Sequence, residues 1–348
     1  MEKKIVMSVN NLQKPVFAPI LDNNYPNLTD GIPEILIVSP NYLNQIYEPL
    51  ISEFSAKANI QIVNDDLESI KANIDNKDAI ISCPRPLFEK VFDNLKSLKW
   101  VHVGGAGVED YMFNKFIMSN IILTNGKIIQ GPECADHALA LLLSLTRRIN
   151  LVVKGTAKKE LPRPLELYNK KAVIFGLGGI GMGIAERAKA FGMKIYGVDQ
   201  DYKPFHSMFE KIIQPNDLRQ VLSDADVFFM AAPHTGNTQD FIDHKYFKVM
   251  QKKPIFISVS RGATTNINDL TKAVEEGILS GVGIDVSNPE PLPEDHPLRG
   301  YDNVLITPHI AGLSDQNRNR SIEVIRINIS NFIEGIPLIN VVDKQLGY

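Results

Sequence analysis

A glycine-rich turn between an apolar segment and an amphipathic segment constrains the fold of this chain most strongly. The apolar segment is KAVIF at 171–175, and the helix-like pattern after the turn continues through Ala190. The turn follows the pattern G-x-G-x-x-G, which in a strand–turn–helix context is typical of a dinucleotide site, because glycines let the backbone approach a pyrophosphate. The N-terminus of the following helix offers N–H groups and a favourable dipole to that anion. The residues that we predict to bind a cofactor here are Gly176, Gly178, Gly179, Ile180 and Gly181.

An acidic residue ends the next strand-like run, KIYGVD at 194–199. Asp199 follows Gly181 by about 18 residues, close to the spacing of about 20 in dinucleotide-binding domains. A carboxylate at this place accepts hydrogen bonds from both ribose hydroxyls and repels a 2′-phosphate. The sequence therefore predicts NAD rather than NADP, and we interpret nearby Lys203 as a solvated loop lysine rather than a phosphate partner.

Apolar runs of strand length alternate with amphipathic segments on both sides of the glycine turn, which predicts parallel sheets covered by helices. The runs that we expect to form strands are 34–40, 58–63, 78–82, 99–107, 121–125, 171–175, 194–199, 226–232, 254–260, 280–286 and 303–308. The expected fold is α/β, with two doubly wound domains of the Rossmann or flavodoxin-like type. The nucleotide-binding domain, 131–311, would be inserted in a substrate domain made of 34–130 and 312–348, after an N-terminal extension at 1–33.

One segment, ECADHALALLLSLTRRI at 133–149, is apolar around most of its circumference when it is drawn as a helix. Such a helix in a water-soluble protein must be buried on several sides. We interpret it as a helix that connects the domains or lies at a subunit interface, and we expect a homodimer.

Composition excludes several classes of function. The chain has 348 residues and a net charge of −3, which gives no reason to expect nucleic acid as a partner. No apolar run approaches the roughly 18 residues of a membrane-spanning helix, and the N-terminus does not resemble a signal peptide. Cys83 and Cys134 are too few for a disulfide framework, so we expect two small buried thiols and a reducing, cytoplasmic setting.

Three residues with complementary chemistry follow three successive predicted strands: Arg261 after FISVS, Glu290 after GIDV, and His309 after NVLITP. Oxidation of an alcohol by hydride transfer needs a base for the hydroxyl proton, a cation to polarise the oxygen, and a fixed cofactor. The carboxyl ends of strands in a doubly wound sheet converge on the ligand crevice. We therefore expect all three to face one cleft, as the catalytic residues of an enzyme that transfers a hydride.

Several stretches, taken together and in order, resemble the D-isomer-specific 2-hydroxyacid dehydrogenase family from about Glu34 to the C-terminus. They are GGAGVED, CADHALALLLSLTRR, the glycine turn, PHTGNT, SVSRGATTNINDL, GIDVSNPEPLP and TPHIAG. The resemblance implies an NAD-dependent enzyme that transfers a hydride between the cofactor and a D-2-hydroxy acid or its 2-keto acid. Its active site would lie in a cleft between two domains that can close.

The family resemblance also implies roles for single residues. His309 would be the general acid/base, and Glu290 would hydrogen-bond it and favour the imidazolium form. Arg261 would bind the carboxylate and carbonyl oxygen of the substrate with its planar fork. Ser260 and Asp285 would contribute to cofactor binding, with Asp285 holding the nicotinamide carboxamide. The residues whose backbone N–H groups would bind the substrate carboxylate are Gly105, Ala106 and Gly107.

Other interpretations remain open. His234 could line the nicotinamide side of the cleft or could have only a loop role, and the remaining histidines have no spacing that suggests a metal site. A relative in the same superfamily oxidises formate, and it pairs its histidine with Gln rather than Glu. Glu290 therefore disfavours formate as the substrate of this chain. A phosphite-type dehydrogenase and an NAD-sensing protein similar to corepressors are the alternatives. The side chain of the substrate is not readable, since it depends on residues near 82–87 and Gly104.

Overall fold

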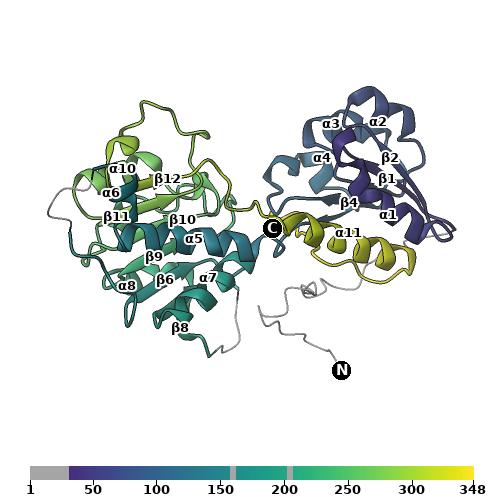
Figure 1. Cartoon of the computed structure of the whole chain (residues 1–348). Coiled ribbons are helices and arrows are strands. Elements are labelled where there is room, and N and C mark those ends of the chain that lie inside the picture. Colours follow the sequence, from purple (N-terminus) through teal and green to yellow (C-terminus); the bar gives the residue numbers. More distant parts are fainter. Residues whose placement is uncertain (1–30, 157–161, 202–206) are drawn as a thin grey trace. The chain divides into compact units, whose positions relative to one another are not determined.

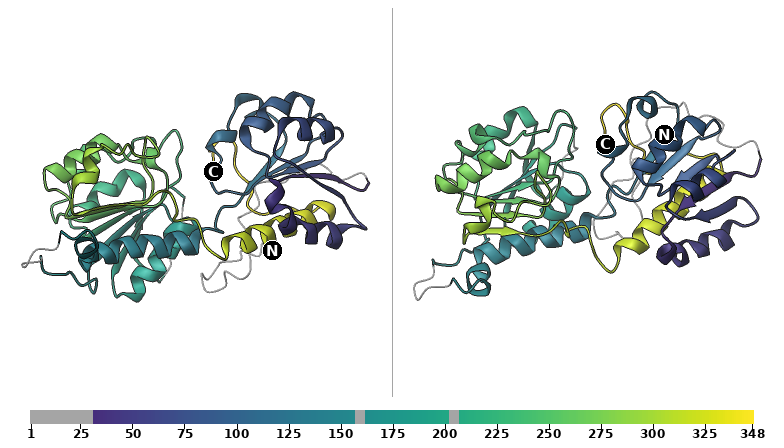
Figure 2. Two further views of the ribbon diagram at one scale, coloured as in Figure 1. Left: turned by 45° about the horizontal axis from the view of Figure 1, so that its top comes forward. Right: turned by 90° about the horizontal axis from the view of Figure 1, so that it is seen from above.

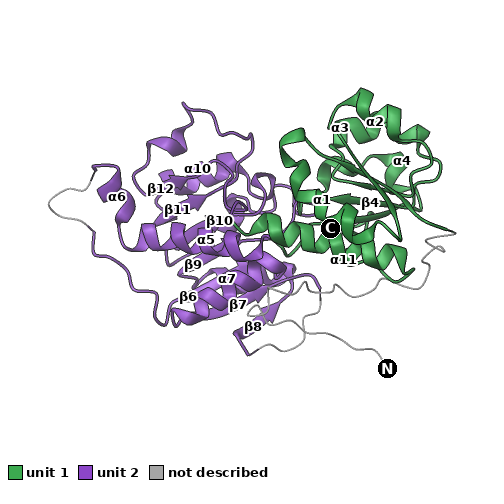
Figure 3. Cartoon of the chain, turned by 45° about the vertical axis from the view of Figure 1, so that its right-hand side comes forward, with its two compact units in different colours: residues 1–129, 315–348 green, residues 130–314 purple. Residues whose placement is uncertain are grey.

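The computed structural model describes residues 31–156, 162–201 and 207–348. Lys203 and most of the predicted N-terminal extension lie outside the described residues. The chain divides into two compact units, one made of 1–129 and 315–348 and the other of 130–314 (Figure 3). Each unit is an α/β fold built on a fully parallel sheet, which confirms the predicted fold class.

The first unit contains a five-stranded sheet with the order β2-β1-β3-β4-β5. Figure 1 labels β1, β2 and β4 of this sheet. Its strands are β1 (Glu34–Val38), β2 (Asn59–Val63), β3 (Ala79–Ile81), β4 (Trp100–Val103) and β5 (Ile122–Asn125). Its helices are α1 (Asn44–Phe54), α2 (Leu67–Asn73), α3 (Arg85–Val91), α4 (Asn114–Ile117) and α11 (Asn317–Ile333). Short 3₁₀ helices lie at η2 (Asn41–Leu43), η3 (Phe92–Asn94) and η4 (Glu109–Tyr111).

Both faces of this sheet are buried, because successive side chains of a strand point to opposite faces. Ile35 and Ile37 pack with residues of α1 and α11, whereas Leu36 and Val38 pack with residues of α2 and α3. Helices α1 and α11 run beside each other (Figure 2). Burial on both faces explains why the sequence of β1 is a continuous apolar run rather than an alternation of apolar and polar residues.

The second unit contains a seven-stranded sheet with the order β12-β11-β10-β9-β6-β7-β8. Its strands are β6 (Lys171–Phe175), β7 (Lys194–Val198), β8 (Phe209–Ile213), β9 (Val227–Met230), β10 (Ile255–Ser258), β11 (Gly281–Ile284) and β12 (Val304–Ile306). Its helices are α5 (Gly131–Thr146), α6 (Ile149–Val153), α7 (Gly179–Ala190), α8 (Leu218–Leu222), α9 (His244–Phe247) and α10 (Ile267–Glu275). Short 3₁₀ helices lie at η5 (Pro215–Asp217), η6 (Gly262–Thr264) and η7 (Pro297–Gly300).

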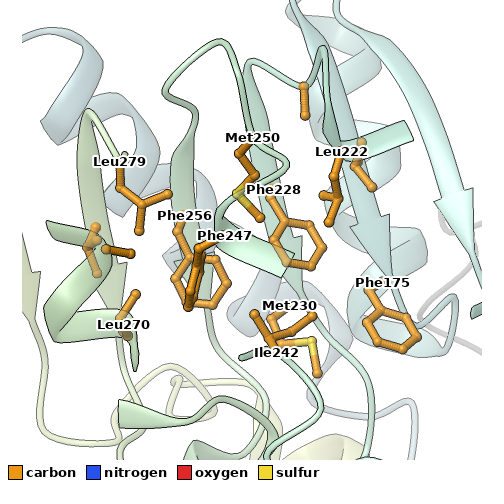
Figure 4. Packing of buried hydrophobic residues seen from close by; sticks show 14 of the residues in the cluster. Phe175, Leu222, Phe228, Met230, Ile242, Phe247, Met250, Phe256, Leu270 and Leu279 are labelled. Atoms are coloured by element: carbon orange, nitrogen blue, oxygen red, sulfur yellow. The ribbon is translucent and has the colours of Figure 1, made fainter. Parts of the chain in front are cut away.

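Two hydrophobic clusters cover the faces of the second sheet. Phe228 and Phe256 lie in the cluster that includes residues of α8, α9 and α10, and Figure 4 shows their rings packed near Phe247 of α9. On the opposite face, Phe229 and Ile257 pack with residues of α5 and α7. The predicted multi-sided burial of the 133–149 segment is therefore explained within this unit, where α5 packs against α7, β10 and β11.

The structure differs from the predicted elements at two places. Strand β8, which pairs with β7 at the edge of the sheet, was not predicted, because its segment FEKII carries two exposed charged residues. The predicted helix at 133–149 is two helices, since Arg148 adopts a left-handed conformation with φ of 63° between α5 and α6. None of the helices in the described ranges is long and apolar enough to span a membrane.

Candidate active site

The glycine turn joins β6 to α7 and depends on the absence of side chains. Gly176 has φ of 92°, and a Cβ atom there would lie 2.6 Å from the backbone of Ala232. A Cβ atom on Gly181 would lie 1.8 Å from the carbonyl oxygen of Gly176, so this position accepts only glycine. Gly178, directly before α7, instead has open space where its Cβ would lie. This arrangement fits a phosphate group that approaches the backbone at the start of α7.

Asp199 comes directly after β7, and its carboxylate reaches back to the glycine turn. Its Oδ2 accepts a hydrogen bond of 2.7 Å from the N–H of Leu177, inside the turn, and its Oδ1 accepts one of 2.9 Å from the N–H of Asp201. The side chain is half-buried. A negative charge is therefore fixed next to the turn, where the ribose of a bound dinucleotide would lie.

His309 and Glu290 form a hydrogen-bonded pair at the ends of β12 and β11, two strands that are neighbours in the sheet. His309 Nδ1 contacts Glu290 Oε1, while Glu290 Oε2 accepts a hydrogen bond of 3.3 Å from the N–H of Ser287. Both side chains remain partly exposed, at 45% for the histidine and 39% for the glutamate. An accessible His–carboxylate pair of this kind can donate or accept a proton through the second ring nitrogen, Nε2.

Arg261 follows β10, the strand on the other side of β11. Its Nη1 donates a hydrogen bond of 2.9 Å to the carbonyl oxygen of Ser260, and the residue is half-buried. A Cβ atom on the next residue, Gly262, would lie 2.0 Å from the carbonyl oxygen of Ser287. The loop that carries Arg261 therefore touches the loop that carries Glu290, and the three predicted catalytic residues lie on adjacent loops of one unit. Ser260 itself is buried, and its hydroxyl has no hydrogen-bond partner within the described ranges.

Asp285, the first residue after β11, is a buried carboxylate with 2% of the residue exposed. Its Oδ1 accepts hydrogen bonds from the Thr307 hydroxyl (2.5 Å) and the Ile310 N–H (3.0 Å), and its Oδ2 accepts one from the Ala311 N–H (2.8 Å). His137 of α5 contacts Thr307 Oγ1 through Nε2, at 2.8 Å. The Asp285 carboxylate, which was predicted to hold the nicotinamide carboxamide, is thus already hydrogen-bonded to the segment around His309.

The predicted carboxylate-binding loop, Gly105–Gly107, lies in the first unit after β4. The carbonyl oxygen of Gly105 accepts a hydrogen bond of 2.8 Å from the N–H of Gly126, and that of Ala106 accepts one of 2.6 Å from Asn125 Nδ2. In the described part of the chain, no hydrogen bond is donated by the N–H groups of these three residues. A Cβ atom on Gly105 would meet no atom within 4 Å. The loop therefore has both the open space and the donors that a small anion needs.

The other residues that were considered in the sequence have local partners. His234 Nε2 contacts Gln239 Oε1 at 2.6 Å, a contact within its own loop. Burial raises the pKa of Cys83 and of Cys134 to about 12 each, so both thiols are inert at neutral pH. No group of three or more His, Cys, Asp or Glu residues suited to a metal ion occurs among the residues that the structure describes.

Two parallel α/β units, one with a dinucleotide-type glycine turn, place the chain among nucleotide-binding proteins of Rossmann-like fold. The family model "D-isomer specific 2-hydroxyacid dehydrogenase, NAD binding domain" matches residues 139–311. A glyoxylate reductase from Thermococcus litoralis is 31% identical over 281 residues, which cover 77% of this chain and 84% of that protein. A hydroxypyruvate reductase from Blautia hydrogenotrophica is 28% identical, covering 80% of this chain and 89% of that protein.

Solved structures agree with these relatives. A D-isomer specific 2-hydroxyacid dehydrogenase family protein from Aeromonas salmonicida is 27% identical, with a TM-score of 0.75 and coverage of 90% of this chain and 99% of that one. A D-isomer specific 2-hydroxyacid dehydrogenase from Xanthobacter autotrophicus, in complex with NADPH and MES, has the same fold with a TM-score of 0.76, at 21% identity over 91% of this chain and 100% of that one. The chain belongs to the D-isomer specific 2-hydroxyacid dehydrogenase family, a family of oxidoreductases that use a nicotinamide cofactor.

Two residues with a place in this site were not predicted as part of it, Thr307 and His137. Thr307 lies two positions before His309, in the same TPH motif, but its hydroxyl gave no chemical signal of its own. His137 lies on α5, far from His309 in sequence, and only the fold brings it to Thr307. Contacts of this kind depend on how a helix packs on the strand ends, which spacing along the chain does not reveal.

Proposed function

We propose that the protein interconverts a D-2-hydroxy acid and the corresponding 2-keto acid with NAD(H), with His309 as the acid/base. The observation that carries this proposal is the His309–Glu290 pair on the strand-end loops of the unit that also contains the glycine turn. An accessible imidazole held by a carboxylate is the group that proton transfer to a carbonyl oxygen requires. The family membership supplies the reaction class, and the pair supplies the chemistry.

Each residue of the trio has a distinct task in the direction of reduction. A bound nicotinamide cofactor supplies the hydride that becomes attached to C2 of the keto acid. His309, with Nδ1 engaged by Glu290, gives a proton from Nε2 to the carbonyl oxygen as negative charge develops there. Glu290 stabilises the imidazolium before transfer and fixes the plane of the ring. Arg261 holds the substrate carboxylate and polarises the carbonyl, for which its always-charged guanidinium is suited.

The cofactor preference is proposed from Asp199. A carboxylate fixed beside the glycine turn can accept hydrogen bonds from the ribose hydroxyls, whereas it would repel the 2′-phosphate of NADP. A structural neighbour of low identity contains NADPH, so the preference needs a direct test. We expect kcat/KM with NADH to exceed that with NADPH by at least tenfold. Asp199→Ser should reduce this ratio, because it removes the repulsion but keeps a hydrogen-bonding group.

Small 2-keto acids are the proposed substrates. Relatives named glyoxylate reductase and hydroxypyruvate reductase act on molecules with short side chains. The open space at Gly105, where a Cβ would meet no atom within 4 Å, supports a carboxylate-binding role for this loop. A panel that starts with glyoxylate, hydroxypyruvate and pyruvate and extends to larger 2-keto acids therefore tests the substrate. Homodimer formation and a cytoplasmic location remain further predictions, and sedimentation velocity would test the first.

The test of the reaction follows NADH absorbance during turnover of this panel, with the product's configuration determined by chiral chromatography. His309→Ala should lower kcat/KM by about 10²- to 10⁴-fold, the usual contribution of a general acid/base, while the NADH dissociation constant changes little. Arg261→Ala should lose turnover similarly. His296→Ala, a matched control in the same unit at a histidine that caps η7, should keep full activity. NADH binding without turnover of any acid would instead indicate a sensor, and an unchanged rate in His309→Ala would refute the assignment.

A further inference from the structure

The segment from Thr307 to Ala311, which carries His309 at its centre, is wrapped around a single buried carboxylate. Asp285 accepts hydrogen bonds from a hydroxyl two residues before the histidine and from the N–H groups of the two residues after it. The N–H of His309 itself donates a hydrogen bond of 2.9 Å to the main-chain carbonyl oxygen of Asp285. Four hydrogen bonds therefore connect this one residue to a segment five residues long.

The hydrogen bonds that reach Asp285 through Thr307 have a fixed direction. An ionised carboxylate only accepts, so the Thr307 hydroxyl must donate its hydrogen to Asp285 Oδ1. The oxygen of that hydroxyl can then only accept from His137 Nε2, which lies 2.8 Å away and must carry a hydrogen. His137 Nε2 is also 3.5 Å from Asp285 Oδ1. The order of donation is thus from His137 on α5, through Thr307, to Asp285.

The conformation of His309 explains why such a network is needed. Its φ is 55°, in the left-handed region, which is uncommon for any residue other than glycine. A side chain at positive φ leaves the backbone in a different direction from one in an extended strand. The contact of His309 with Glu290 therefore depends on the backbone of 307–311 being held in place.

The end of β11 also holds the partner of the histidine. The N–H of Ser287, two residues after Asp285, donates to Glu290 Oε2, and the Ser287 hydroxyl donates to the carbonyl oxygen of Pro289 at 2.7 Å. One short extension of β11 thus fixes both members of the His309–Glu290 pair.

We propose that Asp285, Thr307 and His137 are positioning residues, which hold the 307–311 segment so that the imidazole of His309 meets both Glu290 and the substrate oxygen. This inference rests on the proposed role of His309 as the acid/base. The Asp285 side chain is only 1% exposed, and both of its oxygens serve the segment. Asp285 thus holds the segment from the end of β11, and α5 holds it through the Thr307 hydroxyl.

Paired substitutions separate this role from general loss of structure. Thr307→Val keeps the shape of the side chain but removes the hydroxyl, whereas Thr307→Ser keeps the hydroxyl. His137→Leu removes the donor, whereas His137→Gln can place an N–H near the same position. Thr271→Val is the matched control, because Thr271 lies in the same unit and its hydroxyl makes one hydrogen bond, of 2.8 Å to the carbonyl oxygen of Ile267 within α10.

Steady-state kinetics with saturating NADH and the best substrate of the panel, together with NADH binding by fluorescence titration, give the result. We expect Thr307→Val and His137→Leu to lower kcat by about tenfold to a hundredfold, as a displaced reacting group does. Thr307→Ser and His137→Gln should recover to within about threefold of the wild-type kcat. NADH affinity and the melting temperature should stay close to those of Thr271→Val.

The outcomes that overturn the inference differ from those that overturn the proposed function. If His309→Ala is inactive but Thr307→Val and His137→Leu, both folded, turn over at the wild-type rate, the positioning role is wrong and the function stands. If both lose activity only in proportion to lost NADH affinity, the network serves the cofactor and the positioning role is also wrong. If Thr307→Val does not fold, the His137→Leu and His137→Gln pair decides, since that side chain is 20% exposed on α5. Activity in His309→Ala would remove the basis of both proposals.

Discussion

The first unit should lose stability in mild acid because of one buried histidine. His102 on β4 is 1% exposed, and its Nδ1 lies 2.8 Å from the hydroxyl of Thr124. That hydroxyl accepts a hydrogen bond of 2.8 Å from Trp100 Nε1, and the carbonyl oxygen of Val101 lies 3.5 Å from it. The nearer acceptor for its hydrogen is the ring nitrogen of a neutral His102. A protonated imidazole would present a second donor to the same oxygen. Burial lowers the pKa of His102 to about 3, from an ordinary value of 6.5.

The sign and size of the effect follow from proton linkage. Between pH 6.5 and pH 3 the unfolded chain binds a proton at His102 and the folded chain does not, so the free energy of unfolding falls as the pH falls. Each unit of pKa difference is worth about 1.4 kcal/mol, which gives a loss of about 2 kcal/mol at pH 5 and about 4 kcal/mol at pH 3. Above pH 6.5 this contribution is constant.

Trp100 is the only tryptophan in the chain and packs beside His102, with ring centroids 6.4 Å apart, so its fluorescence reports on this unit. Urea unfolding followed by this signal between pH 4 and pH 7.5 gives the profile. His102→Asn is the reference, because its amide oxygen can accept from Thr124 but does not titrate. The variant should be less stable at pH 7 and should lack the additional slope in acid. The two profiles running parallel between pH 4 and pH 6.5 would refute the reasoning.

Three further predictions concern the turn, the thiols and the C-terminus. Gly181→Ala should lower NADH affinity at least tenfold in a fluorescence titration, because the added Cβ would lie 1.8 Å from the Gly176 oxygen; unchanged affinity would show that the turn does not bind the cofactor. Cys83 and Cys134, both buried with pKa values raised to about 12 by burial, should react with a disulfide reagent only on unfolding, so prompt release of two equivalents would contradict their burial. Lys344→Met should destabilise the first unit by about 2 kcal/mol in the Trp-monitored urea assay, because its ammonium donates to three main-chain carbonyl oxygens; wild-type stability would show that these bonds contribute nothing net.

The fold could be predicted from the sequence because strands that are buried on both faces consist mainly of apolar residues. Most of the strands are apolar runs, although β2 at the other sheet's edge carries exposed Asn59 and Gln61. Two-sided coverage by helices is the reason that β6 and β10 contain hardly any polar residues. Strand β8 escaped prediction for the converse reason, since Glu210 and Lys211 are exposed at the sheet edge. The split between α5 and α6 was missed because a single left-handed residue, Arg148, interrupts a helical pattern without a glycine or proline.

Only some residues of the candidate active site could be predicted from the sequence. Arg261, Glu290 and His309 could be selected because they lie in the loops that follow three strands of one parallel sheet, whose carboxyl ends converge on the ligand crevice. The structure brings the last two into contact. Their roles in the reaction remain predictions. The contact between Gly262 and the Ser287 backbone, which brings the first loop to the second, gave no signal beyond a glycine after an arginine.

Asp285 shows why residue type alone does not determine a role. An aspartate at the end of a buried strand, beside a proposed cofactor site, can bind the cofactor or can accept hydrogen bonds from backbone N–H groups of a neighbouring loop. The second task leaves no pattern in the sequence, because the partners are main-chain atoms that every residue except proline has. A buried carboxylate without such partners would be costly, so the burial of Asp285 itself requires that the loop be folded around it. Stability of the loop and orientation of His309 are then consequences of the same hydrogen bonds, and substitutions that spare the fold but remove one donor are the means to separate them.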